Sequence, residues 1–226
     1  GFTGPETILE GPKGFYAGLC PDPVPQAVTA DPDAPWAAYL TSIKPWPCCR
    51  HTHPAIDAAL DLSARTAGRA IESVSVETYQ AALDVCDRDR PETEYQAKFS
   101  LQHCVAAALS EGRIDFASFD AGARARQANL RPLVRLAAAE PYRSAYPVHW
   151  GARVEAVLSD GTRHSAARTD AKGDPEAPLS RAEMIAKAEM LMRLGGLAQP
   201  GPLIEAILAM AEENAPLPSL ILGRVR

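Results

Sequence analysis

The sequence predicts an α+β protein, because helical and strand-like patterns fall in separate runs along its 226 residues. The clearest helical pattern runs from Pro54 to Ala67, with proline just inside its start and Gly68 just past its end. The clearest strand signal is Asp160-Gly161 between two strand-like runs, which is typical of an antiparallel hairpin. We therefore expect antiparallel strands with packed helices, followed by C-terminal helices.

The other expected elements follow from the same kinds of pattern. The proline- and glycine-rich residues 1–47 predict extended connections around one or two short helices. Alternating β-branched residues predict a strand over 70–79. Apolar stripes predict helices over 94–110, 120–139, 180–194 and 202–213, and strand-like runs over 148–158 and 162–168 form the hairpin. Ser180 and Glu183 have the spacing of a capping box at the start of their helix.

The polar connector over 170–178 predicts a domain boundary. We expect an α+β domain over residues 1–178 and a C-terminal helical segment over 179–226.

Composition narrows the class of protein. Hydrophobic residues make up 46% and charged residues 23%, which is typical of a folded globular protein. The net charge of -5 excludes nucleic acid and anionic membranes as partners held by bulk electrostatics. The apolar run over 203–211 is far shorter than the ~20 residues that cross a bilayer, so we expect no membrane span.

The five cysteines and the first residues indicate a compartment. An odd number of cysteines without regular spacing is typical of reduced thiols in a cytoplasmic protein. Residues 1–14 have neither the basic nor the apolar region of a secretory signal. We expect a cytoplasmic protein.

The densest group of chemically active residues lies between Lys44 and Pro54. It contains Lys44, Arg50, His51 and His53 and directly precedes the expected helix. Thr52 or His53 is the expected N-cap, so the positive end of the helix dipole and unpaired N–H groups point to the same place. The segment predicts a carboxylate site, with a solvated surface loop as the simpler alternative. Cys48, Cys49, His51 and His53 do not have common zinc-site spacing, so we expect no metal.

His103 is the second candidate. It lies among apolar residues of the helix expected over 94–110, where a buried structural histidine is the ordinary outcome.

Several segments, in order, resemble the MmgE/PrpD superfamily. The run from Lys44 to Ala58, beginning Lys-Pro-Trp-Pro-Cys-Cys-Arg-His, is similar to its lysine-proline-aromatic signature. The segments Gly1–Pro5, Leu9–Phe15, Ala97–Leu109 and Pro178–Ser180 also resemble family segments. The resemblance spans the chain from Gly1 to about Arg193.

The resemblance implies a lid domain, with the active site in a cleft shared with an all-helical domain that this chain lacks. Family members dehydrate 2-methylcitrate, decarboxylate cis-aconitate or epimerise an imino-dicarboxylate without a metal or organic cofactor. The resemblance also implies a homodimer in the full-length protein. We expect a lyase acting on a di- or tricarboxylate in the full-length enzyme and an inactive isolated chain.

The resemblance also assigns roles. Lys44 matches the active-site lysine, which binds or polarises a substrate carboxylate, and Arg50 and His51 are further binding candidates. Cys49 stands where some relatives have a catalytic histidine, so the acid–base group is Cys49, His51 or His53. His103 stands where some relatives have an active-site tyrosine, so the resemblance makes His103 a further catalytic candidate, to donate or accept the proton. An iminodisuccinate-type epimerase and a non-catalytic module that binds a carboxylate or a partner subunit remain as alternatives.

Overall fold

The computed structural model describes residues 4, 6–12, 14–20, 22, 24–28, 31, 33 and 36–213. The chain divides into two compact units, Gly1–Leu40 and Thr41–Arg226. The boundary expected at residue 178 stays a prediction. In the part of the chain that the structure describes, no helix is long and apolar enough to cross a membrane.

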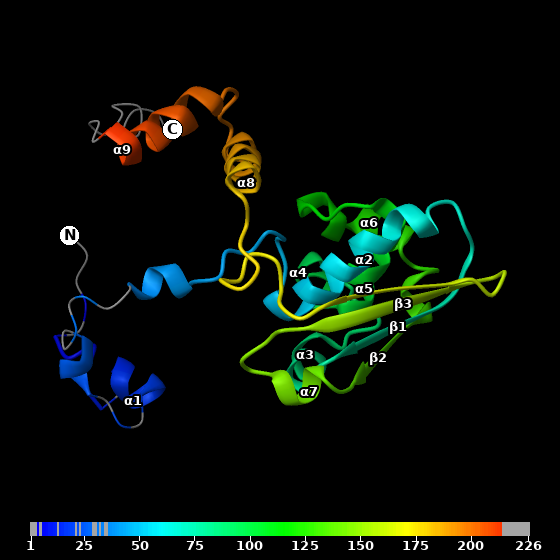
Figure 1. Ribbon diagram of the computed structural model, residues 1–226, viewed down its shortest axis with the longest axis horizontal. Coiled ribbons are helices and arrows are strands. Elements are labelled where there is room, and N and C mark those ends of the chain that lie inside the picture. The colour runs from blue at the N-terminus through cyan, green and yellow to red at the C-terminus, as the bar shows by residue number, and fades with distance from the viewer. Residues whose placement is uncertain are drawn as a thin grey trace. The chain divides into compact units, whose positions relative to one another are not determined.

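Among its described residues, the first unit has the short helical segments α1 (Phe15–Leu19), η1 (Pro25–Val28) and η2 (Ala37–Leu40). The second unit contains the sheet and the longer helices (Figure 1). Its helices are η3 (Arg50–Thr52), α2 (His53–Thr66), α3 (Gln80–Cys86), α4 (Glu94–Ala97), α5 (Leu101–Glu111), η4 (Phe116–Phe119), α6 (Ala121–Arg126), η5 (Arg131–Leu133), α7 (Tyr142–Ala145), α8 (Arg181–Leu194) and α9 (Gly201–Glu213). Its strands are β1 (Ile71–Thr78), β2 (Val134–Ala138), β3 (Ala152–Leu158) and β4 (Arg163–Arg168).

The strands form one mixed sheet in the order β2-β1-β3-β4. β1 pairs in parallel with β2, with Val76 opposite Leu136, and antiparallel with β3, with Val76 opposite Val154. β3 and β4 form the expected hairpin, in which Gly161 has a φ of +83°. The α+β prediction is confirmed, and the sheet adds one parallel pair to the antiparallel strands that the sequence indicated.

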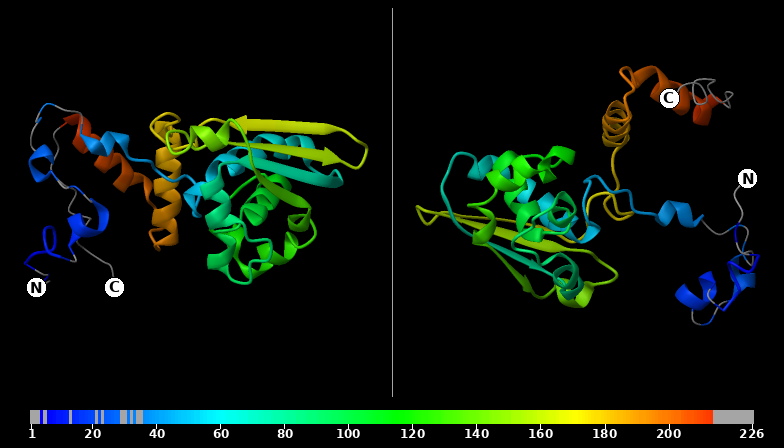
Figure 2. Two further views of the ribbon diagram at one scale, coloured as in Figure 1. Left: turned by 90° about the horizontal axis from the view of Figure 1, so that it is seen from below. Right: turned by 180° about the vertical axis from the view of Figure 1, so that it is seen from behind.

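Helices α2 and α5 pack against each other and cover one face of the sheet (Figures 1 and 2). The face they cover carries the alternate buried residues of β3, including Val154 and Ala156. Ile56 and Leu62 of α2 and Leu101 of α5 are fully buried between these layers. This core fixes the start of α2, which directly follows the basic segment, residues 44–53.

Several predicted boundaries are confirmed. α2 has proline within its first two positions and ends just before Gly68, whose φ is +69°. β1 and both hairpin strands lie within the predicted ranges. Ser180 and Glu183 form the capping box of α8, each accepting a hydrogen bond from the other's backbone N–H.

The single helix predicted over 94–110 is wrong, because the chain forms α4 and α5 with a break at residues 98–100. Ser100 causes the break: its hydroxyl accepts from the N–H of His103 at 3.0 Å and donates to the carbonyl of Arg88 at 2.6 Å. A serine that caps a new helix and binds a distant carbonyl replaces continuous helical hydrogen bonding. Gly112, with a left-handed φ of 64°, ends α5.

The helix predicted over 120–139 is also wrong beyond its first turns. Asp120 caps the short α6, and the chain then forms η5 and strand β2. Pro132 lacks an N–H for a continuing helix. The following Val134 and Leu136 face a vacant edge of β1, and pairing with that strand outweighs helix propensity.

Candidate functional site

The Lys44 segment is held in place by a loop more than a hundred residues away in sequence. The N–H of Ile43 donates to the carbonyl of Gly173 at 2.8 Å. Gly173 has a φ of +91°, and a Cβ atom there would overlap the carbonyl oxygen of Ile43. Only glycine fits this close approach, so Gly173 sets the position of the backbone next to Lys44.

Two further links join the same loop to the basic segment. The guanidinium of Arg50 binds the carboxylate of Asp174, with Nη2 to Oδ1 at 2.6 Å, and Asp174 is almost fully buried. Asp57 accepts from the indole of Trp46 at 2.8 Å and from the backbone N–H of Lys172 at 2.9 Å. The segment over 43–57 is therefore fixed by hydrogen bonds from several directions.

Lys44 lies on the wall of a cavity of about 410 Å³. Its ammonium donates to the carbonyl of Cys48 at 3.3 Å. Two more lysines line the same cavity: Lys98, which pairs with Glu94 at 2.7 Å, and Lys187, which donates to the carbonyl of Lys44 at 2.6 Å. The other lining residues are Pro45, Trp46, Pro47, Cys48, Cys49, Tyr95, Phe99, Phe116, Met190 and Leu191. The arrangement combines three cations with a largely apolar wall.

The helix start is less open than the sequence suggested. Thr52 and His53 are buried, and their N–H groups already donate to the carbonyls of Cys49 and Arg50. The hydroxyl of Thr52 donates to Cys49 O at 2.8 Å rather than capping α2. The helical turn η3 directly precedes α2. Its hydrogen bonds use the N–H groups of Thr52 and His53, so these groups are not free to bind a ligand.

Two cysteines stand next to Lys44 on the cavity wall. A hydrogen bond with Cys86 is the main cause that lowers the pKa of Cys49 to about 6, against the opposing effect of burial, and the charge of Lys44 adds to it. Burial opposes ionisation of Cys48, but hydrogen bonds with Cys104 and His53 lower its pKa to about 5. Both thiols therefore have a pKa below the ordinary value for cysteine, which favours the thiolate.

His51 faces away from this cavity into an aromatic cluster. Its ring stacks on Trp150 with centroids 4.7 Å apart, and its Nδ1 is 3.0 Å from the hydroxyl of Tyr79. The guanidinium of Arg50 lies over the same indole, 3.7 Å from the ring centroid. Burial, and then the charge of Arg50, lower the pKa of His51, so its imidazole is neutral near pH 7.

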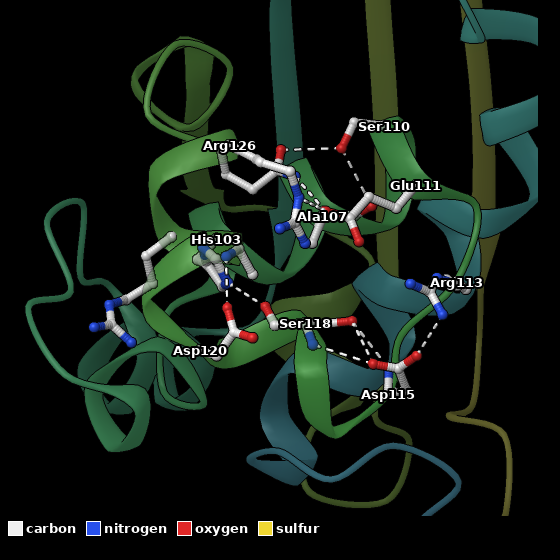
Figure 3. Close-up of polar contacts among 12 residues, drawn as sticks. His103, Ala107, Ser110, Glu111, Arg113, Asp115, Ser118, Asp120 and Arg126 are labelled. Atoms are coloured by element: carbon white, nitrogen blue, oxygen red, sulfur yellow. Dashed lines mark hydrogen bonds and ion pairs between the residues drawn. The ribbon is translucent and has the colours of Figure 1, made fainter.

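His103 of α5 is fully buried and is not among the residues that line the Lys44 cavity. Figure 3 shows it together with Ser118. Its Nε2 donates to the carbonyl of Ser118 at 2.8 Å, because a carbonyl oxygen only accepts. Burial lowers the pKa of His103, which keeps the ring neutral. Within the described residues its Nδ1 has no hydrogen-bond partner. These contacts are those of a structural histidine.

The structure thus brings together some of the predicted site residues and separates others. Lys44 and Cys49 share the cavity wall, whereas Arg50, His51, His53 and His103 are not among its lining residues. Lys98 and Lys187 could not be predicted as site residues from the sequence, because neither an i,i+4 ion pair nor a lysine within a helix is a signal of a site. Among the described residues, no group of three or more histidine, cysteine or acidic side chains is arranged to hold a metal ion.

Comparison with known families gives one match. A family model described as the MmgE/PrpD C-terminal domain matches residues 46–199, about two thirds of the chain. The match includes Cys48 to His53, α5 and all four strands, and it begins just after Lys44. No curated protein matches the chain.

Proposed function

The chain belongs to the MmgE/PrpD C-terminal domain family, and on that basis we propose that it supplies the lysine side of a carboxylate site in a cofactor-independent lyase. The proposed activity resembles that of 2-methylcitrate dehydratase, with a di- or tricarboxylate as substrate. An all-helical domain supplies the other wall of the cleft, and the full-length protein is a homodimer.

The observation that carries this proposal is the fixed position of Lys44 on the wall of the cavity, with Lys98 and Lys187 beside it. Removing a proton next to a carboxylate adds negative charge to an anion, so the site needs fixed cations. Gly173 and Asp174 hold the backbone on both sides of Lys44, which reduces the entropy lost when a ligand binds.

Cys49 is the acid–base group of this proposal. It lines the cavity next to Lys44, unlike His51, His53 and His103, and its pKa of about 6 suits proton transfer near neutral pH. Lys44 holds the substrate carboxylate, while the thiolate of Cys49 accepts a proton from the neighbouring carbon. Arg50 and His51 support this wall through Asp174 and Trp150 rather than by touching the substrate.

The same position of Cys49 favours an epimerase as the second candidate. A thiol that gives and takes a proton on one face of a carbon, opposed by a second base in the helical domain, inverts that carbon without losing water. A reaction in deuterated water followed by NMR separates the two activities. Loss of water supports the lyase, and deuterium exchange at one carbon without loss of water contradicts it.

Binding tests the role of Lys44 directly. We expect Lys44→Ala to weaken binding of a tricarboxylate probe, citrate, about tenfold, because a charged hydrogen bond is worth about 1.5 kcal/mol or more. Isothermal titration of the full chain measures this. Lys172→Ala is the matched control, since Lys172 pairs with Glu183 and does not line the cavity. Equal affinity of Lys44→Ala and the unchanged chain overturns the proposal.

A further inference from the structure

The wall of the Lys44 cavity is unusually apolar for a site that binds only a polycarboxylate. Apart from three lysines and two cysteines, its lining residues are aromatic rings, prolines and long aliphatic side chains. The described residues that line it include no aspartate or glutamate. A carboxylate oxygen placed against the apolar part would lose water without gaining a hydrogen-bond donor, which is costly. The apolar part of the wall therefore suits a different part of the ligand.

The base of this apolar part is held by the core of the protein. Trp46 and Phe99 are partly buried and pack against the hydrophobic core cluster. The ring of Tyr95 lies beside that of Phe99, with centroids 4.9 Å apart. A wall that is already in place costs little entropy when a ligand binds to it. These rings form a preformed surface for an apolar group.

The rim of the same surface is exposed to water. Tyr95 of α4, Phe116 of η4 and Leu191 of α8 are exposed large side chains, and all three line the cavity. Exposed apolar side chains that gather around one cavity are typical of a binding surface, whereas single ones are ordinary. Covering them with an apolar group of a ligand removes their surface from water, which stabilises the complex.

Two of the three lysines keep their charge for a ligand. The ammonium of Lys44 donates to the carbonyl of Cys48, and that of Lys187 donates to the carbonyl of Lys44. Both acceptors are uncharged, so the two ammonium groups are not neutralised by them. Lys98 differs, because it pairs with Glu94 and lies 5.9 Å from the ring centroid of Phe116. The cavity thus places unneutralised cations directly beside aromatic rings.

We propose that the ligand of the Lys44 cavity is a dicarboxylate that carries a bulky apolar substituent, either an aryl or a branched alkyl group. Its carboxylates bind Lys44 and Lys187, and its substituent packs on the rings and on Leu191. The cavity of about 410 Å³ is large enough, since small-molecule sites range from ~300 to 1,000 Å³. The proposal rests on the proposed function for its carboxylate site and narrows the class of substrate.

A matched pair of probes tests the substituent. Succinate and benzylsuccinate are both dicarboxylates and differ by one phenylmethyl group. Isothermal titration of the full chain measures the affinity of each. We expect benzylsuccinate to bind about tenfold more tightly, because its phenyl ring leaves water on the apolar wall. We also expect Lys44→Ala to weaken the binding of both probes.

Substitutions on one helix locate the apolar contact. Leu191→Ala should weaken the binding of benzylsuccinate about threefold and leave that of succinate unchanged, because only the ring loses a neighbour. Leu194→Ala is the matched control: it is also on α8 and exposed, but Leu194 does not line this cavity. Circular dichroism checks that the variants fold, and Tyr95→Ala replaces Leu191→Ala if that variant does not.

The outcomes separate this proposal from the proposed function. Equal affinity for the two probes, with both weakened in Lys44→Ala, overturns the apolar substituent and leaves the carboxylate site in place. Tighter binding of benzylsuccinate that is unchanged in Lys44→Ala contradicts the carboxylate site, and with it a dicarboxylate as the ligand. Binding of neither probe overturns both proposals.

Discussion

At the scale of single residues, the candidate site consists of Lys44 and of the groups that hold the segment around Lys44 in place. Gly173 allows the backbone to approach Ile43, and Asp174 binds Arg50 from a buried position. Neither residue stands out in the sequence, since each lies in a polar connector between patterned segments. Lys44 was visible in the sequence as a candidate, but the residues that hold its segment in place were not.

Replacing Gly173 by alanine tests this support. We expect a loss of about 2 kcal/mol in the free energy of unfolding, because the new Cβ atom overlaps Ile43 O and the left-handed φ is strained. Urea denaturation measures the loss. Gly161→Ala is the matched control: its φ of +83° is similar, but nothing lies within 4 Å of the new atom, so we expect about 1 kcal/mol. Equal losses contradict the role of the close approach.

The thiolate of Cys49 gives a second prediction at this scale. Its alkylation by iodoacetamide should rise with pH through about 6 rather than through the ordinary thiol value of 9.0, because only the deprotonated sulfur reacts. Mass spectrometry of the Cys49 peptide at a series of pH values measures the rate, with Cys49→Ser as background. Lys44→Met should move the midpoint upwards, since the charge of Lys44 favours the thiolate. A midpoint near 9.0 contradicts the prediction.

At the scale of elements, local signals predicted the helices and turns that carry their own boundary residues. Proline and glycine bound α2, and Ser180 and Glu183 begin α8, so both helices lie where they were expected. The break before α5 and the strand β2 were not predicted. Ser100 binds the distant Arg88 carbonyl, and Val134 pairs with β1, and such contacts are set by the tertiary fold.

The same limit applies to the site. The run from Lys44 to His53 stood out as a candidate segment because charge is local in sequence. The outward or inward direction of each side chain depends on packing, and so His51 stacks on Trp150 while Cys49 faces the cavity.

The capping box of α8 gives a prediction for this scale. Ser180→Ala should lower stability by about 1 kcal/mol, because the N–H of Glu183 loses its acceptor. Hydrogen exchange of the backbone amides in the first turn of α8 should become faster, by the factor that corresponds to this loss of stability. Ser180→Asp is the control, since a carboxylate also accepts from this N–H. The prediction is wrong if both variants exchange alike.

At the scale of the whole molecule, the hydrophobic core belongs to the second unit. The cluster of buried core residues runs from Cys48 to Ala156, within Thr41–Arg226. The described residues of the first unit contribute no hydrophobic side chain to that cluster. The second unit should therefore fold by itself.

A chain that starts at Thr41 tests this independence. We expect its thermal midpoint to match that of the full chain within about 2 °C, since less than about 1 kcal/mol of core packing is lost. Near-ultraviolet circular dichroism reports on Trp46 and Trp150, which both pack against the core. A large fall in the midpoint, with loss of the aromatic signal, shows that the first unit stabilises the second.

The hydrogen bond between Ile43 and Gly173 bears on the order in which parts of the chain fold during synthesis. Ile43 leaves the ribosome 130 residues before Gly173. Arg50 precedes Asp174 by 124 residues, and Asp57 precedes Lys172 by 115. Contacts that join distant parts of a chain form late in folding. The nascent chain can assemble α2 and β1 early, but its lysine acquires a defined place only after the hairpin has emerged and the loop behind it closes.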